Sequence, residues 1–152
     1  MVEIFIILLG ILIDRVTKIW AIEVLSKFSQ VIVIKDLFSL LYLQNKGAAF
    51  GILQGKLYFL TIITIIVVGG MIFYIIKYKP SEKLIRISFS LIISGALGNL
   101  MDRMVYKYVV DFISVHYKDI YYFPVFNIAD VMVVVGTALL AFYLLKEEKY
   151  GK

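Results

Sequence analysis

The sequence of 152 residues contains no cysteine and only one histidine, His116. The chain therefore forms no disulfide and performs no thiol chemistry, and it lacks the donors of a zinc site built from His and Cys. A serine hydrolase would need His116 beside an activated serine, but the G-x-S-x-G turn that exposes such a serine is absent. A lone histidine is seldom catalytic, so we expect carboxylates to carry any catalysis here.

Charged residues are also scarce, since they make up 18% of the chain, whereas 62% of it is hydrophobic and the mean hydropathy is +0.93. Soluble proteins are roughly 45–50% apolar. A membrane-crossing helix needs about 20 mostly apolar residues, and the segments that meet this requirement are approximately 4–22, 57–76, 84–101 and 128–145. We therefore predict a membrane all-α fold, a four transmembrane helix bundle that forms a single domain over residues 1–152.

The first apolar segment carries charges of its own, Asp14, Arg15 and Lys18. No basic stretch precedes it and no clear cleavage site follows it, so we expect a retained span rather than a secretory signal. Asp14 and Lys18 are four residues apart and share a helix face. An ion pair that makes both charges tolerable near lipid and a contact with substrate are both compatible with this spacing.

Basic residues predict the orientation in the membrane. The short link 77–86 is densely basic, and the tail after Leu145 adds three lysines. Short basic segments remain in the cytoplasm, so we expect both termini there and the connections 23–56 and 104–127 outside. The net charge of +5 suits anionic lipid headgroups. Nucleic acid is not an expected partner, because no basic stretch is interleaved with stacking aromatics.

The two outward connections differ in character. Residues 31–43 are rich in β-forming side chains interrupted by Lys35-Asp36, which predicts two short strands around a turn. This would be a small extracytoplasmic β-rich region at the membrane surface. The small residues after Asn45 are expected to let the backbone approach a ligand closely. Connection 104–127 is expected to form a second extracytoplasmic loop or helix.

Residues 94–103, Ser-Gly-Ala-Leu-Gly-Asn-Leu-Met-Asp-Arg, combine small and polar side chains. The small residues allow a neighbouring helix to approach closely. Asn99, Asp102 and Arg103 follow at spacings that place them on one side of a helix. A packed helix end with a polar cap explains the small residues, but such a cap needs only one polar group. The segment is therefore a candidate part of a site.

Asp111 and Asp130 are the best candidates for two carboxylates that share a proton. Asp111 stands in an apolar run, a setting that favours its neutral form. No basic residue lies within four positions of Asp130, whereas Asp102 has Arg103 beside it and is more suited to remain a fixed anion. Asp130 also stands three residues after Asn127, as in a capping box, so a structural role for Asp130 is equally supported.

Five motifs occur in an order and at spacings that resemble the signature of the lipoprotein signal peptidases (signal peptidase II), bacterial inner-membrane aspartyl proteases. They are Asp14-Arg-Val-Thr-Lys18, Asn45-Lys-Gly-Ala-Ala-Phe-Gly51, Gly95-Ala-Leu-Gly-Asn-Leu-Met-Asp102-Arg103, Val110-Asp111-Phe112 and Phe126-Asn127-Ile-Ala-Asp130. Each motif alone is weak, but the five together are specific and cover nearly the whole chain. Ser94 stands where many family members have glycine, a change expected to affect packing only.

The resemblance implies two catalytic aspartates, Asp111 and Asp130, and a set of substrate-binding or supporting residues. That set is Asp14, Lys18, Asn45, Asn99, Asp102, Arg103 and Asn127. It also implies cleavage of lipid-modified prolipoproteins just before a cysteine that carries a diacylglyceryl group, with no metal and no other cofactor. The expected location is the bacterial inner (cytoplasmic) membrane, with the active site toward the outer face. Membrane lipids are expected as partners, and the expected oligomeric state is a monomer.

Two other classes of protein remain open on the residues alone. A proton-coupled transporter would also place carboxylates in its spans, but it would more often show internal repeats and broken helices. Neither feature is visible in the sequence. A non-catalytic membrane scaffold would explain the apolar spans and the small residues, but it would not explain several polar clusters on one side of the membrane.

Overall fold

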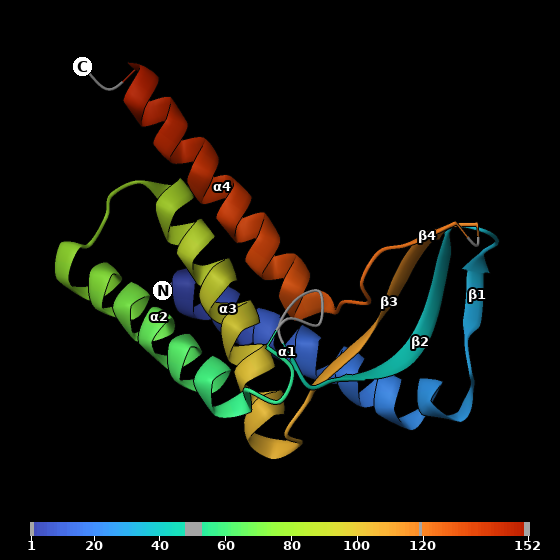
Figure 1. Ribbon diagram of the computed structural model, residues 1–152. Coiled ribbons are helices and arrows are strands. Elements are labelled where there is room, and N and C mark those ends of the chain that lie inside the picture. Colours follow the sequence, from blue (N-terminus) through green and yellow to red (C-terminus); the bar gives the residue numbers. More distant parts are fainter. Residues whose placement is uncertain (1, 48–52, 119, 151–152) are drawn as a thin grey trace.

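The computed structural model describes residues 2–47, 53–118 and 120–150, and it joins long helices to a small antiparallel sheet at one end (Figure 1). Each long helix covers one of the predicted apolar segments and extends a few residues beyond it. The elements follow in the order α1 (Val2–Glu23), a 3-10 turn η1 (Leu25–Lys27), β1 (Val31–Ile34), β2 (Phe38–Asn45), α2 (Leu57–Tyr78), α3 (Lys83–Val105), β3 (Val109–Tyr117), β4 (Tyr121–Tyr122) and α4 (Ile128–Tyr150).

Helix α3 lies at the centre, and α1, α2 and α4 pack around it (Figure 1). In the most apolar stretch of 18 residues of α3, half of the stretch is buried inside the molecule. The buried share of the corresponding stretch is 6% in α2 and 11% in α4. The apolar side chains of the outer helices therefore face outward, as Ile66 and Val134 do. Continuous apolar surfaces of this size are typical of contact with lipid or a partner.

Among the described residues, α2, α3 and α4 are long and apolar enough to cross a membrane. Helix α1 is as long as α2, but it carries Asp14, Arg15 and Lys18 and is not one of these three candidates. The prediction of a helical membrane protein with a small β region is thus confirmed. The predicted count of four spans stays a prediction.

Small residues of α3 let α1 and α4 approach closely, as the sequence indicated. Gly95 lies against the backbone carbonyl of Ala129 in α4, where an added Cβ would collide with atoms that cannot move aside. At Gly98 an added Cβ would lie 2.5 Å from Oδ2 of Asp14 in α1. The absence of side chains at these two positions therefore brings three helices together beside the polar residues of α3.

The sheet has the strand order β1-β2-β3-β4, and neighbouring strands are antiparallel. The predicted pair of strands around Lys35-Asp36 is confirmed as β1 and β2, and Asp36 adopts a left-handed φ of 62°, which aspartate tolerates better than most residues. The expected second loop or helix is wrong for Val109–Tyr117, which is strand β3. Its β-branched and aromatic residues become a strand because β2 offers a partner.

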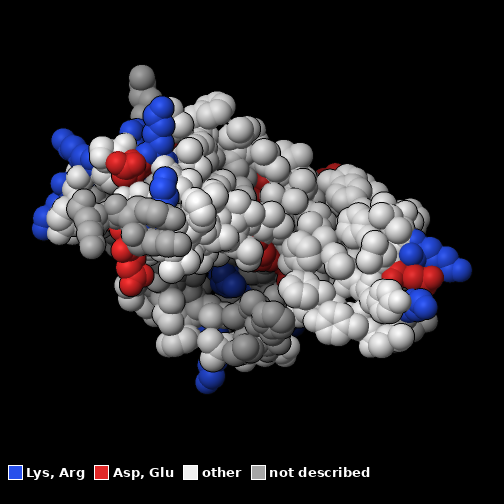
Figure 2. Space-filling model, turned by 90° about the horizontal axis from the view of Figure 1, so that it is seen from above, with Lys and Arg blue, Asp and Glu red and all other residues white. Residues whose placement is uncertain are grey.

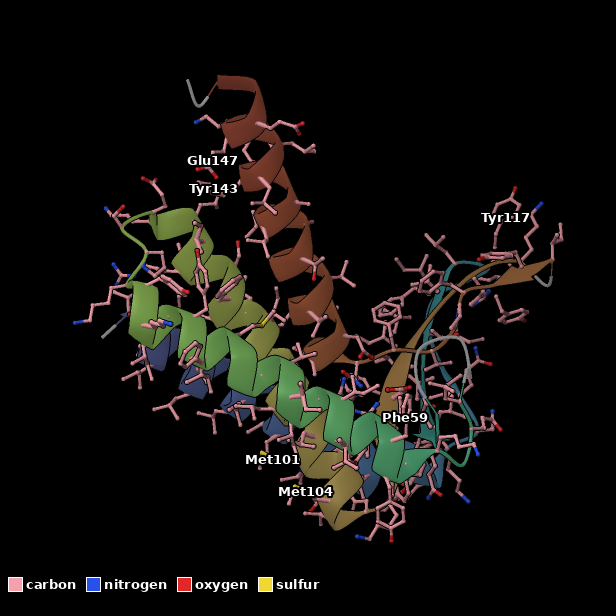
Figure 3. All side chains as sticks on the ribbon, turned by 60° about the vertical axis from the view of Figure 1, so that its left-hand side comes forward. Phe59, Met101, Met104, Tyr117, Tyr143 and Glu147 are labelled. Atoms are coloured by element: carbon pink, nitrogen blue, oxygen red, sulfur yellow. The ribbon has the colours of Figure 1, made fainter. Side chains whose placement is uncertain are left out.

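A compact apolar cluster joins the sheet to the end of α1. Ala21 and Leu25 pack against Val110 and Phe112 of β3, and the ring of Trp20 meets Phe112 edge-on at 6.4 Å. The cluster fixes the residues on either side of Asp111. Figure 3 shows the two ends of the molecule, with Tyr117 at the far end of β3 and Tyr143 and Glu147 on α4 at the opposite end.

Candidate active site

Eight of the nine side chains that the sequence singled out form one hydrogen-bonded network where α1, α3, β2, β3 and the start of α4 meet. The eight are Asp14, Lys18, Asn45, Asn99, Asp102, Asp111, Asn127 and Asp130. The ninth, Arg103, is half-buried and interacts electrostatically with Asp130, Asp111 and Asp102. Figure 2 shows a hollow in the middle of the molecule with basic and acidic atoms at its floor.

Asn127 connects the two aspartates that were expected to share a proton. Its side-chain Nδ2 donates to Oδ1 of Asp111 at 2.6 Å, and its backbone N–H donates to Oδ2 of Asp130 at 3.1 Å. Asn127 is completely buried. One residue thus holds both carboxylates, although Asp111 lies on β3 and Asp130 in the first turn of α4.

Asp130 forms the capping box that its spacing from Asn127 predicted. The backbone N–H of Asp130 donates to Oδ1 of Asn127 at 3.0 Å, which completes the reciprocal pair. The other carboxylate oxygen of Asp130 accepts a hydrogen bond of 2.7 Å from Nδ2 of Asn99 in α3. The helix cap therefore leaves one oxygen of Asp130 directed at the network, so the structural and the functional interpretations are compatible.

Asp111 lies on the same face of the sheet as Asn45. The strand register pairs Asp111 with Leu43 and Val109 with Asn45, so the two polar side chains are diagonal neighbours. Nδ2 of Asn45 donates to Oδ2 of Asp111 at 2.9 Å. Asp111 is 1% exposed, so its carboxyl group lies between Asn45 and Asn127 away from bulk water.

The pKa of the Asp111 carboxyl is raised to about 7. Burial is the largest cause and the negative charge of Asp130 the second, while the hydrogen bonds from Asn45 and Asn127 act in the opposite direction. A carboxyl with such a pKa is protonated in a large fraction of molecules near neutral pH. Asp111 can therefore hold a proton near neutral pH, which is a property that a general acid needs.

Lys18 is the centre of the supporting part of the network. Its Nζ lies 2.9 Å from Oδ2 of Asp14 and 3.0 Å from Oδ2 of Asp102, and it donates to Oδ1 of Asn99 at 2.8 Å. The predicted pair between Asp14 and Lys18 is confirmed. The structure adds Asp102 as a second partner of the same lysine.

Asp14 and Asp102 each hold the peptide N–H that precedes one of the two aspartates of the candidate site. Asp14 accepts from the N–H of Ala129 at 3.1 Å, and Asp102 accepts from the N–H of Val110 at 3.0 Å. Because Lys18 binds both carboxylates, a single buried cation positions the backbone before Asp130 and before Asp111.

Arg15 is a member of the network whose role the sequence reasoning missed. Its Nη2 lies 2.6 Å from Oδ1 of Asp102, and its guanidinium lies over the ring of Tyr106. The sequence suggested Arg103 as the charge beside Asp102, but the ion pairs of Asp102 come from α1. The helical spacing of three between Arg15 and Lys18 was the available signal, since it places both cations on one side of α1.

Other features of the sequence concern residues beside the network. The small residues after Gly47 lie outside the described residues, although the N–H of Gly47 donates to Oδ1 of Asn45 at 2.9 Å. His116 lies on β3, where its ring stacks on Tyr122 and its Nδ1 is 3.1 Å from the carbonyl oxygen of Lys118. No group of three or more His, Asp or Glu side chains suited to a metal ion occurs within residues 2–47, 53–118 and 120–150.

Comparisons with known proteins agree on one family. The sequence model of the signal peptidase (SPase) II family matches residues 6–146 of this chain. A lipoprotein signal peptidase of Clostridium tetani (strain Massachusetts / E88) is 57% identical over 148 residues, which cover 97% of this chain and 95% of that protein. A second, of Clostridium novyi (strain NT), is 55% identical and covers 97% and 99%. A solved bacterial membrane enzyme is 36% identical, with a TM-score of 0.90, over 99% of this chain and 92% of its own.

Proposed function

The chain belongs to the signal peptidase II family, and on that premise we propose that it is a membrane aspartyl endopeptidase that removes the signal peptide from prolipoproteins. Family membership implies a peptidase, and the aspartyl mechanism is the further step. The observation that carries this step is the bridge formed by Asn127, which binds the carboxylates of Asp111 and Asp130 within one buried network.

The proposed mechanism uses one proton held between the two catalytic aspartates. Two neighbouring carboxylates cannot both ionise readily, so the pair titrates as a unit. The ionised partner takes a proton from a water molecule, which attacks the scissile carbonyl carbon. The protonated partner donates its proton to the carbonyl oxygen and stabilises the tetrahedral intermediate. The raised pKa of Asp111 supports Asp111 as the acid of the resting enzyme.

The remaining residues have positioning roles in this proposal. Asn127 and Asn99 orient the catalytic carboxylates through the hydrogen bonds described above. Asn45 holds Oδ2 of Asp111. Asp14, Lys18 and Asp102 fix the peptide groups before the two aspartates. Arg103, whose electrostatic partners are both catalytic aspartates, is placed to bind the substrate backbone or the developing negative charge.

We further propose that all four long helices cross the membrane, including α1. A charged helix is tolerated in lipid when its charges are paired inside the protein, and Asp14 and Lys18 are buried and bound to each other. Both termini then lie in the cytoplasm, and the candidate site lies at the outer boundary of the lipid. The chain would act as a single domain and a monomer in the bacterial inner membrane, without a metal or cofactor.

This position explains why the substrate carries a lipid. A soluble protease would have to withdraw two acyl chains from the bilayer, at a cost of about 0.8 kcal/mol for each buried methylene. A site at the edge of the hydrocarbon lets the acyl chains and the signal helix stay in lipid during cleavage. We therefore expect cleavage just before a cysteine that carries a diacylglyceryl group, and we expect the sheet to lie over the bound substrate.

The test is incubation of the purified protein with a diacylglyceryl-modified precursor and with the same precursor lacking the lipid. Release of signal peptide from the modified precursor alone is the expected result, and equal cleavage of both precursors would contradict the lipid requirement. Asp111→Asn and Asp130→Asn should each abolish cleavage while the protein remains folded.

Asp36→Asn is the matched control, because Asp36 lies in the exposed β1–β2 turn and Asn also tolerates its left-handed backbone. This variant should keep full activity. Full activity of either catalytic variant would show that the two-aspartate assignment is wrong. A proton-dependent flux in vesicles without any peptide product would instead indicate a transporter.

A further inference from the structure

A large apolar groove lies at the end of the bundle away from the candidate active site, between the start of α1, the end of α2 and the start of α3. Its volume is about 570 Å³, within the range of roughly 300–1,000 Å³ typical of small-molecule sites. Isoleucines from all three helices line it: Ile4, Ile7, Ile72, Ile75, Ile76 and Ile93. An occupant of this groove must be apolar over most of its length.

A second, smaller groove of about 240 Å³ lies beside the first and is lined by Val2, Ile6 and Ile87. The ion pair between Glu3 and Arg86 borders both grooves. Two apolar grooves that share one charged border suit a lipid that has two acyl chains and one headgroup. A single straight chain, such as a detergent molecule, would fill only one of them.

Positive charge surrounds this centre. Lys79 lines the larger groove and Lys83 the smaller one, and both side chains are exposed. The backbone of Lys79 caps α2 in a left-handed conformation, which holds this lysine at the groove. Since Arg86 is paired with Glu3, the two lysines add net positive charge on either side of that pair. Glu82 is the one acidic residue within the link 77–86.

Many exposed basic and acidic side chains of the helices gather at this same end (Figure 2). Basic pockets between membrane helices on the cytoplasmic side bind anionic lipid headgroups. A zwitterionic lipid with the same acyl chains would fill the grooves but gain less from the lysines. The apolar part of a signal peptide is a poorer match, because its basic n-region would meet Lys79 and Lys83.

We propose that the two grooves bind an anionic diacyl phospholipid, with one acyl chain in each groove and the phosphate between Lys79, Lys83 and Arg86. This lipid is distinct from the diacylglyceryl group of a substrate, because Glu3 and Arg86 lie at the opposite ends of their helices from Lys18 and Asn99. Only its assignment to the cytoplasmic leaflet rests on the proposed function.

The test is native mass spectrometry of the full-length protein in detergent, titrated with phosphatidylglycerol or with phosphatidylcholine that has identical acyl chains. Phosphatidylglycerol should bind at least tenfold more tightly. A lysine near an anionic headgroup contributes roughly fivefold to affinity, so the double variant Lys79→Gln/Lys83→Gln should lose about 25-fold for phosphatidylglycerol and little for phosphatidylcholine.

The matched charge control is Lys77→Gln/Lys146→Gln, which removes two positive charges near the same end. Lys77 lies over the rings of Phe73 and Tyr78, and neither Lys77 nor Lys146 lines a groove. This variant should bind both lipids as the unmodified protein does. An equal loss in the two double variants would mean that bulk charge, rather than this site, attracts the lipid.

A second pair of variants tests the acyl chains. Ile76→Trp fills the larger groove from its rim and should weaken binding of both lipids at least tenfold. Ile66→Trp is the control, since Ile66 lies on the same helix outside the grooves and both isoleucines are 66% exposed, so both variants should fold. Equal affinity of the unmodified protein for the two lipids, or no difference between the tryptophan variants, would overturn the proposal.

The outcome can be interpreted independently of the proposed function, because no precursor is present in these titrations. The inactive variant Asp111→Asn should bind phosphatidylglycerol like the unmodified protein, since Asp111 lies on β3, away from both grooves. A protein that binds the lipid but cleaves no precursor would refute the peptidase assignment alone. A protein that cleaves but shows no headgroup preference would refute the lipid site alone.

Discussion

Loss of Lys18 should destabilise this protein strongly, because three buried acceptors depend on its ammonium group. Its Nζ lies within 3.0 Å of oxygens of Asp14, Asp102 and Asn99, and the side chain has no exposed surface. Replacement by methionine keeps an apolar stem as long as the lysine chain up to Cε and removes the ammonium group, so the packing of α1 is largely preserved. The perturbation is therefore the removal of one charge and three donors.

The magnitude follows from the charge balance of the supporting network. In the native protein two cations, Lys18 and Arg15, face two carboxylates, Asp14 and Asp102. After Lys18→Met one negative charge is uncompensated. Removing one partner of a buried ion pair costs about 3–5 kcal/mol, a large part of a typical unfolding free energy of roughly 5–15 kcal/mol. We expect a loss of that size.

A second substitution separates the charge effect from other effects. Asp14→Asn in the Lys18→Met background restores neutrality, so the double variant should be more stable than the sum of the single effects predicts, by up to about 3 kcal/mol. Both variants that carry Lys18→Met should lose cleavage of lipidated precursor, because Lys18 no longer holds the side chains at positions 14 and 102 that accept from the N–H groups of Ala129 and Val110.

The fluorescence of Trp20 provides the assay. It is the one tryptophan of the sequence, and its edge-on contact with Phe112 joins α1 to β3. Denaturant titrations in detergent micelles, followed by this signal, yield the unfolding free energies of four proteins. These are the unmodified protein, Lys18→Met, Asp14→Asn and the double variant. A loss below about 1 kcal/mol in Lys18→Met, or strictly additive single effects, would refute the view that Lys18 holds the two carboxylates through charge.

Two further predictions concern the pH dependence and the helix contacts. Because the pKa of Asp111 rises from 3.8 to about 7 on folding, the folded state holds a proton that the unfolded state has released between about pH 4 and 7. The unfolding free energy should therefore fall as the pH rises through this window, by up to about 1.4 kcal/mol per pH unit. The slope should flatten in Asp111→Asn, and an unchanged slope would contradict the assignment. Gly98→Ala should cost about 1–3 kcal/mol and reduce cleavage, because its Cβ would displace the carboxylate of Asp14. Gly69→Ala, whose Cβ would meet no atom within 4 Å, should be neutral or slightly stabilising. Equal losses of stability in Gly98→Ala and Gly69→Ala would show that the contact with Asp14 is not the cause.

Much of the candidate site could be predicted, because several of its polar side chains occur at spacings that place them on one side of a helix or in a helix cap. Asp14 and Lys18 lie one turn apart, and their pairing follows from helix geometry. The capping box of Asn127 and Asp130 is also a local pattern, and it forms as expected. Partners distant along the chain were harder to assign. The ion pairs of Asp102 with α1 come from packing and not from its neighbour Arg103.

Residues 109–117 show that secondary structure is also hard to predict where it depends on a partner far away in the chain. Their composition suits a strand, yet a loop or helix was expected, because a strand needs a partner and the sequence does not say which segment supplies one. The partner is β2, more than sixty residues earlier in the chain. The pairing also decides that Asp111 faces Asn45, which no local pattern indicates.

The amino-acid sequence by itself determined where the chain is apolar, where its helices run and which side chains carry chemistry, because hydrophobicity and helix periodicity are properties of neighbouring residues. Only the tertiary structure decided that Asn127 binds two aspartates from different elements, that Lys18 supports both of them, and that two grooves meet at Glu3 and Arg86. These features depend on distances through space between segments far apart in the chain, and packing sets those distances.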